Sequence, residues 1–241
     1  RYFFFIQIII IYFLESLLVK KYEKLCFNKF NKILLLSKKE IDFIEKKYKK
    51  KLAQISFGIN SIKKKFKFHK KNYKIIFIGN IKYAPNKNAC YEFVNKILPS
   101  INEIYPEIEF HILGEISKID KLLLSSKKNV KILNKVKNLD PYLNRTICGI
   151  ANLRIATGIQ TKLLTYMSFG IPSVSSKQVI QNFDAIKEGK LNFYNSNQEL
   201  IKIILKFKKN KNFSLSASKR SLKIIKNFKW EKILPILGKL I

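Results

Sequence analysis

Residues 147–175 read ICGIANLRIATGIQTKLLTYMSFGIPSVS, and the alternation within this stretch decides the fold. The apolar run at 147–153 predicts a strand, residues 160–169 predict a helix, and residues 172–175 predict a second strand. A helix that connects two strands in this way makes them parallel. Parallel sheets bind ligands beyond the carboxyl ends of their strands, so the segment between the first strand and the helix is the first candidate for a binding site.

The same alternation continues on both sides of this unit. Further strands are predicted at residues 74–78, 109–113 and 130–133, and further helices at residues 86–105, 117–125, 197–207 and 216–227, with a short helical turn at 139–144. Strands that alternate with helices of this length indicate an α/β fold with a doubly wound parallel sheet.

The region before this sheet begins with an apolar segment. Residues 2–14 are nearly all apolar, but they are fewer than the roughly 20 that span a bilayer as a helix. We therefore expect a buried segment, with an interfacial segment as the alternative. Because residue 1 is Arg, we also expect the chain to be a fragment of a longer protein.

The residues that follow predict short elements and a connector. They predict a helix at 15–32, a strand at 32–36, a helix at 38–48 that opens on a capping box, and a strand at 52–57. The lysine-rich residues 61–72 are interpreted as an interdomain linker, with an anion-binding patch as the alternative.

The chain is strongly basic, with 48 Lys and Arg against 16 Asp and Glu and a formal net charge of +32. Two interpretations stay open. The lysines are scattered over the whole length, which fits a compositional bias with solvated side chains, but they would also attract an anionic membrane surface or a lipid-linked substrate. Nucleic acid is an unlikely partner because the sequence shows no Arg-rich helix, zinc spacing or RNA-binding aromatic motif.

The cysteines and histidines indicate no catalytic or metal cluster. Cys26, Cys90 and Cys148 lie far apart and are odd in number, which favours a reducing compartment over a disulfide framework. His69 and His111 are also isolated, and His111 lies in an alternating, strand-like run. A structural role is therefore expected for His111.

Two junctions between a strand and a helix carry residues suited to a diphosphate. In the first, a loop with Gly158 leads into a helix that begins near Gln160. The free N–H groups of a helix N-terminus favour anions, Lys162 adds a full charge in the first turn, and Arg154 offers a bidentate contact. Neither a P-loop nor a GxGxxG spacing is present.

The second junction follows the predicted strand at 74–78. Gly79 directly after the strand allows a tight turn or a close approach of a ligand to the backbone. Asn86 is expected to cap the following helix.

These junctions carry a resemblance to a known family. Residues 157–174 resemble the form G-I-Q-x-K-hydrophobic-L-E-A-M-A-x-G-x-P-V-V of retaining GT-B glycosyltransferases in the large glycosyl transferases group 1 family, which includes sugar transferases of exopolysaccharide and cell-envelope synthesis. Residues 77–86 resemble its F-x-G-x-x-x-Y-x-P-N segment. Further landmarks follow in the family's order at residues 22–23, 36–40, 56–60, 140–143 and 228–231. Their order and spacing are more specific than any one motif.

The resemblance implies two Rossmann-like domains with the active site between them. It makes residues 73–227 the domain that binds the nucleotide-sugar, and residues 1–60 the C-terminal remnant of a second Rossmann-like domain, which binds the acceptor. Residues 61–72 would link them, and residues 228–241 would form a C-terminal helix. Most of the acceptor domain would be missing, and the catalytic residues stay unknown.

The resemblance also implies a function and its partners. The expected reaction moves a sugar from a nucleotide-sugar donor to a glycan or lipid-linked acceptor, in the cytoplasm or at the inner face of the membrane, with no metal or other cofactor. Residues 134–139 would lie near the base of the nucleotide. The expected donor-binding residues are Gly79, Asn80, Arg154, Gly158, Ile159, Gln160, Thr161, Lys162 and Thr165.

One position departs from the family's pattern. Thr165 occupies the place of a Glu that bonds the donor ribose in the family, and Thr157, at the place of a second family Glu, is not acidic either. A hydroxyl cannot bind two ribose hydroxyls as a carboxylate does. The resemblance therefore leaves an impaired, GT-B-like binding or subunit protein as the alternative function.

Overall fold

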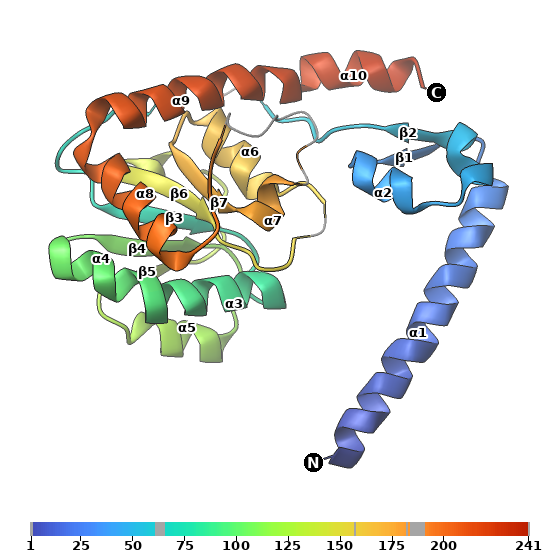
Figure 1. The fold of residues 1–241 in the computed structure, drawn as a ribbon, viewed down its shortest axis with the longest axis horizontal. Coiled ribbons are helices and arrows are strands. Elements are labelled where there is room, and N and C mark those ends of the chain that lie inside the picture. The colour runs from blue at the N-terminus through green and yellow to red at the C-terminus, as the bar shows by residue number, and fades with distance from the viewer. Residues whose placement is uncertain (1, 61–65, 157, 182, 184–190, 241) are drawn as a thin grey trace. The chain divides into compact units, whose positions relative to one another are not determined.

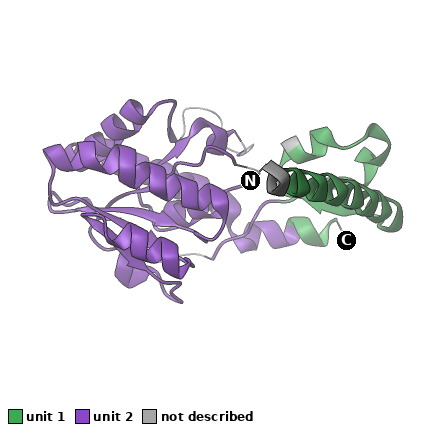
Figure 2. Ribbon diagram, turned by 90° about the horizontal axis from the view of Figure 1, so that it is seen from below, with its two compact units in different colours: residues 1–55, 236–241 green, residues 56–235 purple. Residues whose placement is uncertain are grey.

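The computed structural model describes residues 2–60, 66–156, 158–181, 183 and 191–240. The chain forms two compact units, which Figure 2 shows in different colours. One comprises residues 1–55 and 236–241, and the other comprises residues 56–235. Residues 61–65 of the predicted linker lie outside the described residues.

The larger unit contains a six-stranded parallel sheet with the order β5-β4-β3-β6-β7-β8. The strands are β3 (Lys74–Ile78), β4 (Glu109–Leu113), β5 (Val130–Leu133), β6 (Thr146–Ala151), β7 (Ser173–Ser176) and β8 (Asn192–Tyr194). The α/β fold with a Rossmann-like, doubly wound parallel sheet is thus confirmed. The order reverses between β3 and β6, which makes this pair the topological switch point of the sheet.

Helices cover both faces of this sheet (Figure 1). They are α3 (Ala84–Glu92), α4 (Leu98–Ile104), α5 (Lys118–Ser125), α6 (Thr161–Ser168), α7 (Lys177–Ile180), α8 (Asn197–Lys209) and α9 (Lys211–Ile225), with the 3₁₀ turns η3 (Asp140–Leu143) and η4 (Lys226–Phe228) and the start of α10 (Trp230–Gly238). Ser117, Ser196 and Asn210 cap α5, α8 and α9 through their side chains, which explains why these helices begin where they do.

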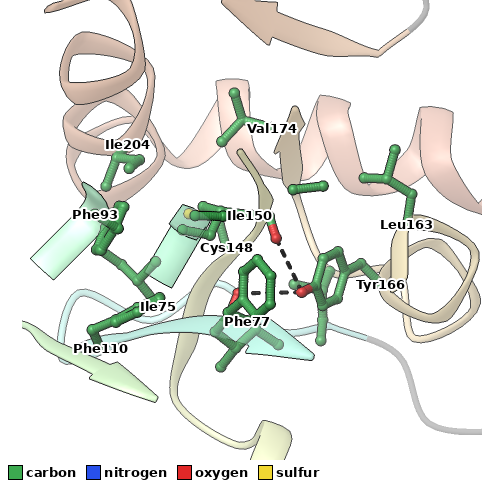
Figure 3. Packing of buried hydrophobic residues seen from close by; sticks show 14 of the residues in the cluster. Ile75, Phe77, Phe93, Phe110, Cys148, Ile150, Leu163, Tyr166, Val174 and Ile204 are labelled. Carbon is green, nitrogen blue, oxygen red and sulfur yellow. Dashed lines mark hydrogen bonds between the residues drawn. The ribbon is translucent and has the colours of Figure 1, made fainter. Parts of the chain in front are cut away.

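The predicted single helix at 86–105 is interrupted. A π-helical turn, η2 (Phe93–Ile97), separates α3 from α4, and the N–H of Leu98 donates to the Phe93 carbonyl. Pro99 lacks an N–H and its ring would meet the carbonyl one turn earlier, so a local widening of the helix relieves the conflict. The Phe93 ring still packs on Phe110 of β4, with 4.4 Å between ring centroids (Figure 3).

Tyr166 of α6 holds the sheet together at the switch point (Figure 3). β3 and β6 pair only as far as Ile76. Beyond it, the fully buried Tyr166 hydroxyl accepts a hydrogen bond from the Ile78 N–H at 2.9 Å and donates to the Ile150 carbonyl at 3.1 Å. The ring lies against Gly149 of β6, where any Cβ would meet it. Tyr166 therefore satisfies strand groups that the ladder leaves without a partner.

Replacing Tyr166 by Phe is expected to lower the free energy of unfolding by about 1–3 kcal/mol, because it keeps the ring but leaves buried strand groups without a partner. Thermal unfolding measures the effect, and Tyr83→Phe is the control because Tyr83 is exposed. An equal, small shift for both variants would contradict the role given to the hydroxyl.

The smaller unit consists of a long helix and a two-stranded parallel sheet. α1 (Tyr2–Lys29) precedes β1 (Ile33–Leu35), α2 (Lys38–Phe43), the 3₁₀ turn η1 (Lys46–Lys51) and β2 (Leu52–Gln54), and β1 pairs with β2. The capping box predicted at the start of α2 is present, since Ser37 and Glu40 exchange hydrogen bonds at 3.2 and 3.0 Å.

The prediction that residues 2–14 form a buried segment is wrong. They continue without a break into α1, because no Gly or Pro interrupts the helix. From Ile6 to Leu14 the side chains are exposed apart from the half-buried Ile8, since the described elements of this unit do not cover them. In the described part of the chain, no helix combines the length and apolar character needed to cross a membrane.

Candidate functional site

The two predicted junctions meet at the carboxyl ends of β3 and β6, at the switch point of the sheet. Gly79 and Asn80 follow β3 directly, and the segment that follows β6 leads to Gln160, the N-cap residue of α6. In doubly wound sheets this is the place where ligands bind. Residues 134–139 follow β5 and therefore lie at the same edge of the sheet.

Lys162 joins the two junctions. Its Nζ donates to Asn86 Oδ1 at 3.0 Å and to Gln160 Oε1 at 3.3 Å, and it lies 5.0 Å from the centroid of the Phe77 ring. Asn86 Nδ2 in turn donates to the Asn80 carbonyl at 2.9 Å. The lysine of one junction is thus connected through Asn86 to the backbone of the other.

The charge of Lys162 has no acidic partner among the described residues. The side chain is only 6% exposed, and its burial lowers its pKa to about 8, while the nearby Cys90 acts weakly in the opposite direction. The oxygens of Asn86 and Gln160 are neutral, so they orient the ammonium group without compensating its charge. A buried cation in this state is well suited to an incoming anion.

The N-terminus of α6 is also prepared for an anion. Gln160, the N-cap residue, makes no side-chain hydrogen bond to the first N–H groups of the helix. Gly158 has φ 72°, in the left-handed region that glycine tolerates. Ile159 and Gln160 are half-buried and Thr161 is exposed, so the turn lies at the surface of this unit.

The structure places Arg154 and Thr165 in other contacts. The Arg154 guanidinium forms a bidentate ion pair with Glu92, at 2.8 Å from Nε and 2.7 Å from Nη2. The Thr165 hydroxyl donates to the Thr161 carbonyl of its own helix at 3.1 Å. Neither contact uses the whole side chain, because the Thr165 oxygen can still accept a hydrogen bond and the Arg154 guanidinium has N–H groups beyond those that bind Glu92. Thr157 lies outside the described residues.

Asn86 and Phe77 are the site residues that the sequence reasoning missed. The prediction that Asn86 caps a helix is wrong, because α3 begins at Ala84 after Tyr83. Asn86 is instead buried, and its amide connects the two junctions. The family-like segment at 77–86 contained both residues, but no local signal in the sequence indicates a contact with a lysine of another helix.

The remaining predicted features lie away from this site. His111 of β4 is buried, its Nε2 is 2.7 Å from Glu109 Oε2, and burial lowers its pKa. The three cysteines are free, and burial raises the pKa of the Cys90 and Cys148 thiols. Among the described residues, no group of three or more His, Cys, Asp and Glu side chains could hold a metal ion.

A family model for glycosyl transferases group 1 matches residues 72–209, which is more than half of the chain. The chain belongs to this family. The match includes both junctions and the whole segment from β3 to α8. No curated protein matches the chain.

Solved structures of GT-B glycosyltransferases share the fold. TarM from S. aureus superposes with a TM-score of 0.72 at 17% identity and covers 92% of this chain. HepE from Anabaena, solved with UDP and glucose, gives 0.70 at 11% identity over 90% of the chain. Sucrose-phosphate synthase from Thermosynechococcus elongatus gives 0.71 at 13% identity, also over 90%.

The chain is shorter than these proteins. It spans 45% of TarM, 64% of HepE and 59% of the sucrose-phosphate synthase. At these identities the likeness concerns the fold, whereas family membership rests on the match of residues 72–209.

Proposed function

We propose that this chain is the donor-binding part of a glycosyltransferase that moves a hexose from a nucleotide-sugar to a glycan or lipid-linked acceptor in cell-envelope or exopolysaccharide synthesis. It would act without a metal or other cofactor, in the cytoplasm or at the inner face of the membrane. The observation that carries the proposal is the position of Lys162, a buried cation without an acidic partner in the described structure, at the junction of two turns that follow β6 and β3.

The leaving group of such a reaction explains this arrangement. Cleavage of the sugar–phosphate bond leaves negative charge on the diphosphate, and preorganised N–H groups and cations stabilise it. The N–H groups at the start of α6 and the Lys162 ammonium would supply this stabilisation, with Gly79 and Asn80 on the other side of the diphosphate. Complexes of HepE with UDP and glucose and of S. aureus TarM with UDP support a uridine nucleotide as the first candidate.

A catalytically impaired, GT-B-like binding or subunit protein is the second candidate. Thr165 favours it, because its hydroxyl is already bonded to the Thr161 carbonyl and cannot hold two ribose hydroxyls. Arg154 also favours it, because Glu92 already binds the Nε and Nη2 edge of its guanidinium group.

Calorimetry with UDP, GDP and ADP tests both candidates. We expect one nucleotide to bind, and we expect Thr165→Glu to tighten its binding by about tenfold, because a carboxylate forms charge-assisted hydrogen bonds to ribose hydroxyls. Binding without any gain from Thr165→Glu would favour the impaired protein. If the folded chain binds none of the three nucleotides, the donor site proposed here is wrong.

A further inference from the structure

The outer face of α5 exposes three large apolar side chains. Ile119 and Leu122 are each 72% exposed and Leu123 is 50% exposed. Their spacing of three and four residues gathers them on one side of the helix. Asp120 and Leu124 are the buried residues of α5, and at about 100° per residue Leu122 points directly away from them. These three side chains therefore project into solvent and are not the edge of the core.

Lysines lie beside these three side chains. Lys118 and Lys121 are exposed on α5 itself, and Lys127 and Lys128 are exposed directly after its C-terminal end. Residues 118–137 together contain seven Lys and a single Asp. We call the three apolar residues together with Lys118, Lys121, Lys127 and Lys128 the α5 ridge.

The acidic residues near the α5 ridge are already neutralised. Asp120 is buried, and its carboxylate is bonded to Ser117 at 2.6 Å, to Tyr91 at 3.0 Å and to Lys87 at 3.4 Å. Glu115 pairs with Lys135 at 3.3 Å and with Lys82 at 3.8 Å. Neither carboxylate therefore offsets the positive charge that the ridge presents to solvent.

We propose that the α5 ridge docks onto an anionic lipid bilayer. Apolar side chains that project beside lysines match the boundary of such a bilayer, because the apolar groups enter the acyl region while the ammonium groups reach the lipid phosphates. The core of a protein interface is depleted in lysine, so a protein partner fits less well. This surface is separate from Lys162 and its neighbours, and the proposal holds whether or not the chain transfers a sugar.

Co-sedimentation of the full chain with vesicles tests the charge of the ridge. The test variant carries Lys121→Glu and Lys128→Glu. The control variant carries Lys219→Glu and Lys223→Glu at exposed positions of α9, and it changes the net charge by the same amount. Figure 1 shows α9 and α5 on opposite sides of the sheet. On vesicles of equal parts phosphatidylcholine and phosphatidylglycerol, the ridge pair is expected to lower the partition coefficient by at least about tenfold. The α9 pair is expected to lower it by less than about threefold. Equal losses for the two pairs would overturn the proposal.

A depth measurement tests the same surface without removing any charge. A polarity-sensitive fluorophore is attached at Ser125→Cys on α5 or at Ser216→Cys on α9, in a chain that also carries Cys26→Ser because Cys90 and Cys148 are buried. On the same vesicles, emission from position 125 should shift to shorter wavelength while emission from position 216 stays unchanged. If the chain binds vesicles but the emission from position 125 does not shift, another surface, such as the apolar residues of α1, holds the chain on the vesicles. The proposal is then wrong.

Discussion

Replacing Lys162 by Met is expected to weaken binding of the nucleoside diphosphate and, in the same protein, to raise the melting temperature. The affinity falls because the diphosphate loses a charge-assisted hydrogen bond, which contributes about 1.5–3 kcal/mol, or roughly ten- to hundredfold in Kd. The stability rises because the folded chain no longer buries an ammonium group at neutral pH. A pKa lowered from 10.5 to about 8 corresponds to roughly 3 kcal/mol at pH values below both.

The lowered pKa of Lys162 also determines how the stability of the fold and the affinity for the diphosphate change with pH. Between pH 8 and 10.5 the unfolded chain holds a proton that the folded chain has lost, so this side chain makes the fold more stable as the pH rises through that window. Binding of the diphosphate follows the opposite direction. The affinity is highest well below pH 8, where the amine is charged, and it should weaken as the pH rises through about 8, by no more than the roughly ten- to hundredfold that the charge contributes.

Lys74→Met is the matched control for Lys162→Met. Lys74 is also partly buried and its pKa is also lowered by burial, but it lies at the opposite, amino-terminal end of β3, with its Nζ 3.5 Å from the Tyr142 carbonyl. Calorimetry and thermal unfolding at several pH values compare the two variants. If Lys162→Met leaves Kd and its pH dependence like those of Lys74→Met, then Lys162 does not bind phosphate.

The strands of the larger unit were predictable because their signals are local. β3 (Lys74–Ile78), β4 (Glu109–Leu113) and β5 (Val130–Leu133) match the predicted bounds, since each is a short apolar run that ends at a turn. α7 (Lys177–Ile180) and β8 (Asn192–Tyr194) were not predicted, because elements of three or four residues leave too short a pattern. The apolar composition of residues 2–14 predicted burial, and this prediction was wrong for α1. Composition does not indicate whether a neighbouring element is present to cover the helix.

The candidate site was predictable in its position but not in its contacts. Gly79 and Gln160 lie where the sequence placed them, because the ends of parallel strands share one edge of the sheet. The burial of Lys162 depends on Phe77 and Asn86, which come from a different strand and a different helix. The ion pair between Arg154 and Glu92 similarly joins residues far apart in the chain. Contacts of this kind join separate elements of the fold and have no counterpart in local sequence.

Replacing Gly114 by Ala is expected to disrupt the fold and the candidate site together. Gly114 follows β4 with φ 147°, a conformation that other residues rarely adopt, and a Cβ there would overlap the Gly79 carbonyl oxygen. The two glycines are held in this close approach by the ladder, since the Gly79 N–H donates to the Leu113 carbonyl at 2.9 Å and the Gly114 N–H to the Leu133 carbonyl at 3.1 Å. Backbone strain and overpacking each cost about 1–3 kcal/mol, so the free energy of unfolding should fall by roughly 2–6 kcal/mol.

The Gly114→Ala variant also shows whether the affinity falls because the site itself is displaced or because the whole fold is destabilised. Because the added methyl group pushes on Gly79, the affinity for the nucleoside diphosphate should fall even at temperatures where the variant remains folded. Gly238→Ala is the control, since a Cβ at Gly238 meets no atom within 4 Å, and it should leave both the melting temperature and Kd nearly unchanged. A Gly114→Ala protein with the stability and affinity of this control would show that β3 and β4 end further apart than the structure places them. The turn at Gly79 would then not be held in the position that the proposed diphosphate site requires.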